Sequence, residues 1–338
     1  MDPNLPLVEL HRHLDGAVRL ETILDLGIHH NLPLPSFDLE GLRPHVQVTT
    51  PQPGVMAFIE KFQWMVGILV DYDAVRRISR ENVEDAKKEG LDYVELRFSP
   101  LFMAQPHSLD PAGVVEAVVD GIHSAARDNQ IRVNLIGILS RTYGVEMAHH
   151  ELLSLLAFKD DITALDLAGD EANFPAVLFK DHFKKAQSAG WHITVHAGES
   201  AGPGSVWHAL RSLAAERIGH AIHAVEDPAL LDYLAENNIG IESCLTSNVQ
   251  TSCVPDYASH PLRIFLNHGI PATINTDDPG ISAITISHEY HIAAPLAGLS
   301  PAQVIQAQKN ALEVAFLSRE EKETLRKNKT SPQRGIEY

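Results

Sequence analysis

The sequence predicts an α/β protein folded as a (β/α)8 TIM barrel, with extra helices inserted after the first strand. Eight short apolar runs have the character of β-strands, and segments with helical periodicity separate them. This alternation favours a parallel sheet covered by helices, and eight strands are the number that closes into a barrel. The alternative is an open, doubly wound sheet. It is weakened because neither a GxGxxG nor a GxxxxGK[ST] phosphate loop follows any of the runs.

The expected strands are short, as parallel strands buried on both faces usually are. They cover residues 7–13, 93–99, 133–139, 163–169, 192–196, 217–220, 240–244 and 272–275. Helical stretches between them cover residues 74–90, 111–130, 178–190, 205–215, 227–237 and 261–269. Pro111 and Pro228 each follow an aspartate, which suits a first helical turn capped by a carboxylate.

The connection between the first two strands, residues 14–92, is longer than any later one. It contains apolar residues at helical spacing from Val55 to Leu69, which predict either an extra packed helix or a lid over the barrel mouth. The two interpretations are compatible. We expect a single domain over residues 1–325 and a polar C-terminal tail over residues 326–338.

The composition is that of a soluble globular protein, with 44% hydrophobic and 21% charged residues among 338. A formal net charge of −17 disfavours nucleic acid and anionic lipid as partners, because both need a basic surface. Cys244 and Cys253 are too few for a disulfide framework, and neither a signal peptide nor a bilayer-spanning apolar run is evident. We therefore expect a cytoplasmic protein with no nucleic-acid or membrane partner, and we make no prediction of its oligomeric state.

Histidines and acids recur where the expected strands end. His11 and His13 share one face of the first strand, His196 and His220 end the fifth and sixth, and Asp277 follows the eighth. Active sites of such barrels lie at the C-terminal ends of the strands. Three histidines and one aspartate suit Zn²⁺ with room for a water, although iron or manganese would fit the same ligand types.

Two further side chains could move protons beside such a metal. Glu199 follows His196 by three residues, close enough to transfer protons without binding the metal. His220 could either hold or deprotonate an attacking water. Metal-assisted hydrolysis is the reaction class that these residue types indicate.

Four segments together resemble the adenosine deaminase family, most closely its bacterial members. They are HRHLDG at 11–16, HAGE at 196–199, SCLTSN at 243–248 and TDDP at 276–279, and the similarity extends from about residue 5 to residue 319. The resemblance implies a zinc-dependent hydrolase of purine metabolism. Its reaction converts adenosine and 2′-deoxyadenosine to inosine and 2′-deoxyinosine, with release of ammonia.

The resemblance also implies roles for the residues around the metal. One Zn²⁺ per chain would be bound by His11, His13, His196 and Asp277. Glu199 would protonate the purine N1, and His220 would orient the attacking water and help manage its proton. Asp277 would also hydrogen-bond that water as it attacks C6.

Substrate contacts follow from the same resemblance. Asp278 would hydrogen-bond the purine N7, and the backbone N–H of Gly169 would face N3. Asp15 would hold the ribose 5′-hydroxyl, with His13 nearby.

Two alternatives to a nucleoside deaminase remain open. One is a related deaminase acting on adenine or on a modified adenine nucleoside or nucleotide. Asp15 favours a nucleoside, because a carboxylate accepts a hydroxyl but repels a phosphate, and relatives acting on adenine tend to carry glutamate there. The other is a non-catalytic nucleoside-binding protein, against which the presence of Glu199, His220 and all four ligands argues.

Overall fold

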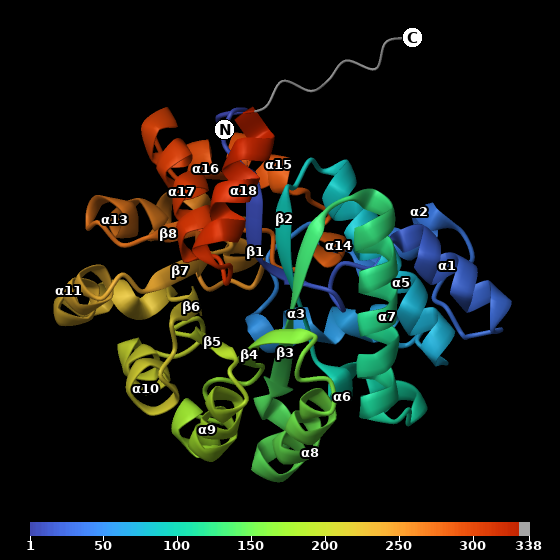
Figure 1. Ribbon diagram of the computed structural model, residues 1–338. Coiled ribbons are helices and arrows are strands. Elements are labelled where there is room, and N and C mark those ends of the chain that lie inside the picture. The colour runs from blue at the N-terminus through green and yellow to red at the C-terminus, as the bar shows by residue number, and fades with distance from the viewer. Residues whose placement is uncertain (331–338) are drawn as a thin grey trace.

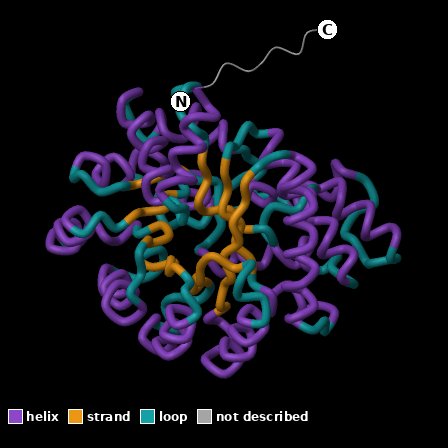
Figure 2. Tube along the Cα trace, viewed as in Figure 1, coloured by secondary structure: helices purple, strands orange, loops and turns teal. Residues whose placement is uncertain are grey.

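The computed structural model describes residues 1–330 and shows one eight-stranded parallel sheet in which each strand pairs with the next in sequence (Figure 1). The strands form a ring, with helices around the outside (Figure 2). The predicted (β/α)8 TIM barrel is therefore confirmed. The strands are β1 (Val8–His13), β2 (Tyr93–Phe98), β3 (Arg132–Ser140), β4 (Ile162–Ala168), β5 (His192–Ala197), β6 (Arg217–His220), β7 (Gly240–Ser243) and β8 (Ala272–Ile274).

The ring is completed where the segment after β8 meets β1. Arg12 and Asp277 form a parallel bridge. The His13 N–H donates to the Asp277 carbonyl at 2.8 Å, and the Asp277 N–H donates to the His11 carbonyl at 3.0 Å. The backbone that completes the barrel therefore also holds Asp277 against the two histidines of β1.

Helices of 6 to 19 residues cover the outer face of the sheet. They are α5 (Tyr72–Lys88), α7 (Pro111–Asn129), α8 (Gly144–Leu156), α9 (Lys180–Ser188), α10 (Pro203–Leu213), α11 (Pro228–Glu236), α13 (Leu262–Asn267), α17 (Pro301–Val314) and α18 (Arg319–Thr330). The helical stretches named from the sequence are confirmed, and α8, α17 and α18 are additional. At the start of α17, Ser300 accepts from the Gln303 N–H while the Gln303 side chain accepts from the Ser300 N–H. This reciprocal cap suits an S-x-x-Q sequence before a helix.

The long connection after β1 folds into several short helices packed on the barrel. They are α1 (Leu20–His29), α2 (Leu39–Val46), α3 (Val55–Ile59), the 3-10 turn η1 (Glu60–Phe62) and α4 (Gln63–Val66). Thr22 of α1 donates to Glu81 of α5 at 2.5 Å. Phe58, Phe62 and Met65 are buried in the main core, so the apolar stripe is packed as one of the two interpretations predicted.

The remaining elements are short turns of helix in the loops. They are α6 (Pro100–Ala104), η2 (Gln105–His107), η3 (Arg141–Tyr143), η4 (Ala176–Phe179), η5 (Ile222–Glu226), α12 (Leu245–Gln250), η6 (Tyr257–Ser259), α14 (Pro279–Ser282), α15 (Ile286–His288), the π-helical turn η7 (Glu289–Ala293) and α16 (Ala294–Leu296).

The C-terminal boundary expected at residue 325 falls inside α18, because that helix continues to Thr330. Residues 331–338 of the expected tail lie outside the described residues. Within residues 1–330, none of the helices combines the length and apolar character needed to cross a bilayer.

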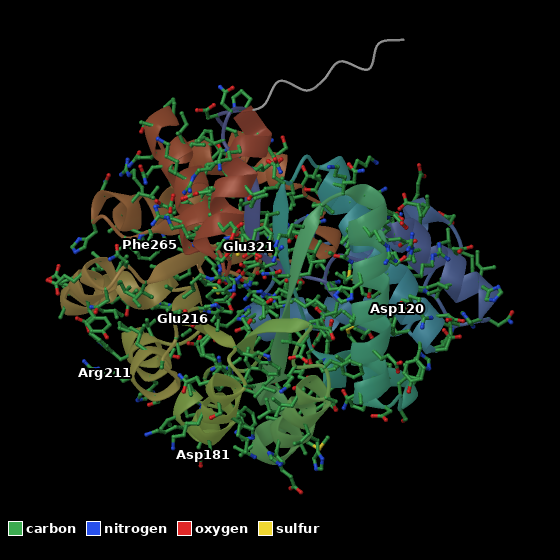
Figure 3. All side chains as sticks on the ribbon, in the orientation of Figure 1. Asp120, Asp181, Arg211, Glu216, Phe265 and Glu321 are labelled. Atoms are coloured by element: carbon green, nitrogen blue, oxygen red, sulfur yellow. The ribbon has the colours of Figure 1, made fainter. Side chains whose placement is uncertain are left out.

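Charged side chains occupy both the outer helices and the interior of the barrel. Asp120 and Asp181 lie on the outer helices α7 and α9 (Figure 3). Arg97, by contrast, is fully buried and donates to Asp166 at 2.8 Å and to Glu242 at 2.6 Å. Burial of a charge is tolerated where such pairing compensates for lost hydration. The barrel core is therefore held by ion pairs as well as by apolar packing.

We expect Arg97→Leu to destabilise the protein by about 3–5 kcal/mol, because it leaves Asp166 and Glu242 with one compensating cation fewer in a dry interior. Chemical denaturation followed by circular dichroism measures the change. Arg76→Leu is the control, since Arg76 pairs with the exposed Asp73 and Asp120, and its loss should cost less than about 1 kcal/mol. Equal losses in the two variants would contradict the expectation.

Candidate active site

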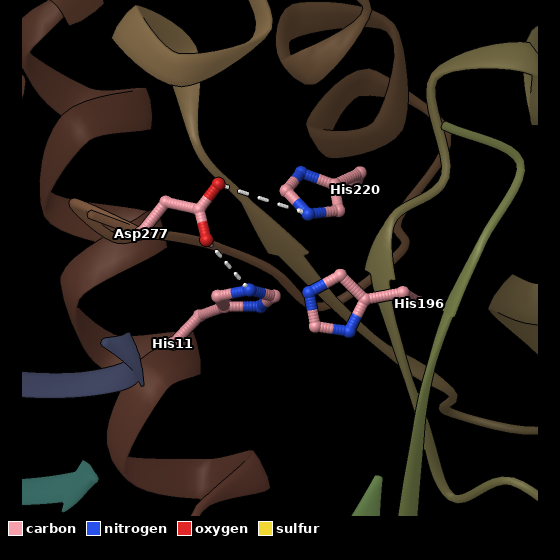
Figure 4. A group of neighbouring side chains, drawn as sticks. All are labelled: His11, His196, His220 and Asp277. Carbon is pink, nitrogen blue, oxygen red and sulfur yellow. Dashed lines mark ion pairs between the residues drawn. The ribbon is translucent and has the colours of Figure 1, made fainter. Parts of the chain in front are cut away.

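Imidazole and carboxylate groups converge at the C-terminal ends of the strands, as Figure 4 shows for four of them. His11 Nε2 lies 3.0 Å from Asp277 Oδ1, and His13 Nε2 lies 3.2 Å from the same oxygen. His13 Nε2 is also 3.3 Å from His196 Nε2. His220 Nε2 lies farther away, 3.9 Å from Asp277 Oδ2. These side chains come from β1, β5, β6 and the segment after β8.

Two of the histidines are oriented by buried carboxylates behind them. His11 Nδ1 lies 2.8 Å from Glu242, and His196 Nδ1 lies 2.9 Å from Asp166. A carboxylate accepts only, so each ring donates from Nδ1 and turns the Nε2 lone pair toward the cluster. Burial lowers the pKa of both rings, that of His196 to about 3, although the neighbouring carboxylates oppose this. Both rings are therefore neutral, which is the form that binds metals.

The donor set fits a divalent cation. His11 Nε2 is buried and has no hydrogen-bond partner, as expected of a lone pair reserved for a metal. Two overlapping groups have ligand atoms within 4.8 Å of one another: His11, His196, His220 and Asp277, and His13, Asp277 and Asp278. The predicted set of His11, His13, His196 and Asp277 draws on both groups. Carboxylates behind two of the imidazoles are also typical of metal sites.

Two residues at the cluster have an uncommon backbone conformation. His220 has a φ of 64° and Asp277 a φ of 66°, in the left-handed region that residues other than glycine seldom adopt. Such strain persists where surrounding contacts over-determine the conformation, and it is concentrated at functional sites. For Asp277 those contacts are the hydrogen bonds that complete the barrel.

Gly16 allows Asp278 to approach the first strand. A Cβ added at Gly16 would lie 1.8 Å from Asp278 Oδ1. The Asp278 side chain is buried, and that oxygen has no partner among the described residues. Burial and the adjacent Asp277 raise the pKa of Asp278 well above its usual range. This shift favours the protonated carboxyl, which is the form that can donate a hydrogen bond.

Glu199 is held at the cluster through its own backbone. The Glu171 carboxylate accepts from four successive N–H groups: Gly198 (2.5 Å), Glu199 (3.1 Å), Ser200 (2.9 Å) and Ala201 (3.1 Å). The Glu199 carboxyl lies 3.8 Å from His220 Nε2. Burial raises the pKa of Glu199 to about 7, and the Asp277 and Glu171 carboxylates act in the same direction. A proton is thus available on Glu199 near neutral pH.

A pocket opens above the cluster, with polar groups on its floor and apolar side chains on its roof. Val55, Phe58, Ile59 and Phe62 of α3 and η1 line the roof. The inserted helices are thus both packed and placed as a lid, so the two sequence interpretations hold together. Gly169, which also lines the pocket, has a φ of 106°, and a Cβ there would lie 2.4 Å from Thr142 Oγ1.

The structure brings the predicted site residues together. Those lining the pocket are His13, Asp15, Gly169, His196, Glu199, His220, Asp277 and Asp278, and His11 lies against Asp277. Sequence reasoning gave no catalytic, metal-binding or substrate-binding role to the groups that orient them: Asp166, which was considered only as support for a turn, and Glu171, Glu242 and Asn248. An acid within or just after a strand was the available signal for the first three, and its partners cannot be read from the chain.

Fold and site together define the class of metal-dependent (β/α)8-barrel hydrolases. The family model described as adenosine deaminase matches residues 6–330. The chain belongs to the adenosine deaminase family, and the resemblance noted in the sequence is confirmed.

Individual proteins support both the family and the fold. The chain is 60% identical to an adenosine deaminase of Yersinia enterocolitica over 326 residues, which are 96% of this chain and 98% of that protein. A solved adenine deaminase of Arthrobacter aurescens has the same fold, with a TM-score of 0.89 at 24% identity, covering 96% of this chain and 98% of that one. An amidohydrolase of Burkholderia ambifaria with bound Zn gives a TM-score of 0.85 at 25% identity, covering 97% and 90%.

The raised pKa of Glu199 has a consequence for stability in metal-free protein. A carboxyl with a pKa of about 7 when folded and 4.5 when unfolded loses folding free energy as the pH rises through this range. Glu199→Gln removes this pH dependence. We therefore expect the free energy of unfolding of the variant, relative to that of wild type, to increase by roughly 2 to 3 kcal/mol from pH 5 to pH 8.

Denaturant unfolding at the two pH values measures this difference. The exposed Glu40 provides the matched control, since Glu40→Gln should leave the gap between variant and wild type nearly independent of pH. The same gap for Glu199→Gln at pH 5 and pH 8 would show that this carboxyl titrates normally.

Proposed function

We propose that this protein catalyses the hydrolytic deamination of adenosine and 2′-deoxyadenosine to inosine and 2′-deoxyinosine, with release of ammonia. One observation carries the proposal: a chain 60% identical over nearly its full length is an adenosine deaminase. The pocket supports it, because an acid with a raised pKa lies beside a cluster of metal-ligand side chains.

The metal we propose is Zn²⁺, one per chain, bound by His11, His13, His196 and Asp277. The Burkholderia amidohydrolase with bound Zn supports this choice, as do the neutral imidazoles facing the cluster. When bound, Zn²⁺ supplies Lewis acidity that lowers the pKa of a water toward 7 and so makes hydroxide available at neutral pH. We prefer His13 to His220 as the third imidazole, because His13 lies closer to both Asp277 and His196.

The protein side chains would act on the purine ring as follows. Attack of water at C6 breaks the aromaticity of the ring and places electron density on N1. Glu199 donates a proton there, for which its raised pKa suits it. Asp277 and His220 hold the attacking water against C6. One proton of that water passes to the amino group, which leaves as ammonia as the C6 carbonyl forms, and the other restores the proton that Glu199 gave to N1.

Substrate orientation would depend on polar groups around the pocket. Purine N7 only accepts hydrogen bonds, so we assign it to Asp278, whose raised pKa favours the protonated form that can donate. The backbone of Gly169 faces the same pocket, and we assign its N–H to N3. Asp15 has one buried oxygen without a hydrogen-bond partner, available to a ribose 5′-hydroxyl.

The same groups argue against a nucleotide substrate. If Asp15 holds the ribose 5′-hydroxyl, as we assign, its carboxylate would repel a 5′-phosphate at the same position. Among the described residues that line the pocket, none is lysine or arginine. A nucleoside therefore fits this pocket better than a nucleotide.

The direct test is the loss of the adenine ultraviolet chromophore, measured side by side with adenosine, 2′-deoxyadenosine, adenine and AMP. We expect turnover of the two nucleosides and about one zinc per chain by elemental analysis. Preference for adenine or AMP would support the related-deaminase alternative. No turnover of any of the four by metal-replete protein would support the non-catalytic alternative.

Glu199→Gln should abolish turnover of adenosine, because the amide keeps the shape of the side chain but cannot protonate N1. Zinc content and nucleoside binding, measured by elemental analysis and calorimetry, should stay close to wild type. An active Glu199→Gln variant would refute the role of this residue while leaving the rest of the site intact.

Asp166→Asn should weaken zinc binding about 10- to 100-fold, since the amide no longer provides the charge that orients and polarises His196. Competition with a chromophoric chelator measures the affinity. Asp170→Asn is the matched control, with the same chemical change on the neighbouring loop, where Asp170 contacts Asn173. Similar zinc affinity in both variants would contradict the orienting role of Asp166.

A further inference from the structure

His220 is the one imidazole at the cluster whose far nitrogen does not face a carboxylate. Its Nδ1 lies 3.1 Å from Nδ2 of Asn248, while its Nε2 faces Glu199 and Asp277. Asn248 Oδ1 in turn lies 3.2 Å from Nε2 of His260. Behind His260, the backbone N–H of Leu262 donates to its Nδ1 at 3.1 Å.

The backbone N–H of Leu262 sets the direction of all three hydrogen bonds in this series, which runs from Leu262 through His260 and Asn248 to His220. A peptide N–H can only donate, so His260 Nδ1 carries no proton and His260 Nε2–H donates to Asn248. Burial also lowers the pKa of His260, to about 3, in keeping with a neutral ring. The opposite orientation of the Asn248 amide would require His260 Nδ1–H to point at the Leu262 N–H, placing two donors face to face.

Asn248 therefore presents its NH₂ group to His220, so His220 Nδ1 accepts. An imidazolium would carry a proton on Nδ1 and could not accept this bond. The ring is therefore neutral, and its single N–H proton lies on Nε2. His220, Asn248 and His260 are at most 3% exposed, so water does not compete for these bonds. Asn248 itself is fixed in α12 by its N–H bond to the Cys244 carbonyl at 3.0 Å.

We infer that Asn248 and His260 are positioning residues that hold His220 as a neutral ring with its proton on Nε2. His220 then donates a hydrogen bond to the oxygen of the attacking water and does not remove a proton from it. The water proton then passes either to the Asp277 carboxylate or to Glu199 after Glu199 has given its own proton to N1. Asp277 Oδ2 and Glu199 Oε2 both lie within 4 Å of the same Nε2. The catalytic meaning of this inference rests on the proposed function. The sequence left two roles open for His220, holding the attacking water or deprotonating it, and the hydrogen bonds favour the first.

The hydrogen bonds of His220 run in the opposite direction to those of His11 and His196. Those two rings donate outward to Glu242 and Asp166 and direct lone pairs at the cluster. His220 accepts from outside and directs a proton inward. The difference also favours His13 over His220 as the third imidazole of the proposed metal site, since the inward nitrogen of a His220 ring in this state has no free lone pair.

Two-bond ¹H–¹⁵N correlation spectra of histidine-labelled, zinc-loaded protein test the inference without substrate. We expect His220, assigned by the signal lost in His220→Gln, to show the pattern of a neutral ring with its proton on Nε2. A ring protonated on Nδ1, or on both nitrogens, would overturn the inference. This measurement on the wild-type protein decides the matter even where a variant fails to fold.

Asn248→Asp provides the second arm, because a carboxylate accepts from both histidines and should move the His220 proton to Nδ1. We expect the inverted spectrum and a loss of kcat of about 100-fold, with the KM for adenosine within about threefold of wild type. Asn248→Ala is the matched comparison, since it removes the amide without imposing either tautomer and should give a mixed pattern.

An unchanged His220 pattern in a folded Asn248→Asp variant would overturn the inference. Failure of the proposed function is distinguishable from this result. If the protein shows the expected His220 pattern but has no activity on any adenine compound, the positioning role is supported and the proposed function is contradicted.

Discussion

The carboxylate of Glu242 on β7 accepts four hydrogen bonds inside the barrel, and the site depends on it. One oxygen accepts from His11 Nδ1 (2.8 Å) and Arg97 (2.6 Å), and the other from Arg217 Nε (2.7 Å) and Thr194 (2.9 Å). These donors come from four other strands. Burial alone would raise the pKa of Glu242, but the two guanidinium groups hold it well below its usual range. A single anion thereby joins five strands and aims a proposed metal ligand.

Carboxylates and amides behind the imidazoles determine what the cluster can do. The same ring becomes a metal ligand or a hydrogen-bond donor depending on the group that meets its other nitrogen. Glu171 has a similar effect through the main chain, by accepting four N–H groups around Glu199. The chemistry of the site therefore depends on residues that contact the pocket side chains from behind. These residues are buried, and their hydrogen bonds restrict the orientations of the side chains that they contact.

Strands and strand-end residues could be predicted from the sequence because both are local signals. The run at residues 217–220 coincides with β6, and His196 and Asp277 were expected near each other because strand ends share one face of a barrel. Glu242 and Asp166 could be recognised only as acids within a strand, and that position says nothing about their partners far along the chain. His260 likewise has no local pattern, and its role depends on Asn248 and on the backbone of Leu262. The boundary expected at residue 325 falls within α18, whose polar sequence resembles a tail.

The hydrogen bonds between Asp277 and the backbone of β1 tie the first strand to the end of the last. During synthesis on the ribosome, His11, His13 and His196 emerge well before Asp277 does. A nascent chain consequently carries three imidazoles with no aspartate to complete the set and no closed ring to hold them. On the proposed ligand set, tight capture of the cation would be deferred until translation has passed the eighth strand, because Asp277 and the hydrogen bonds that close the barrel both come after it.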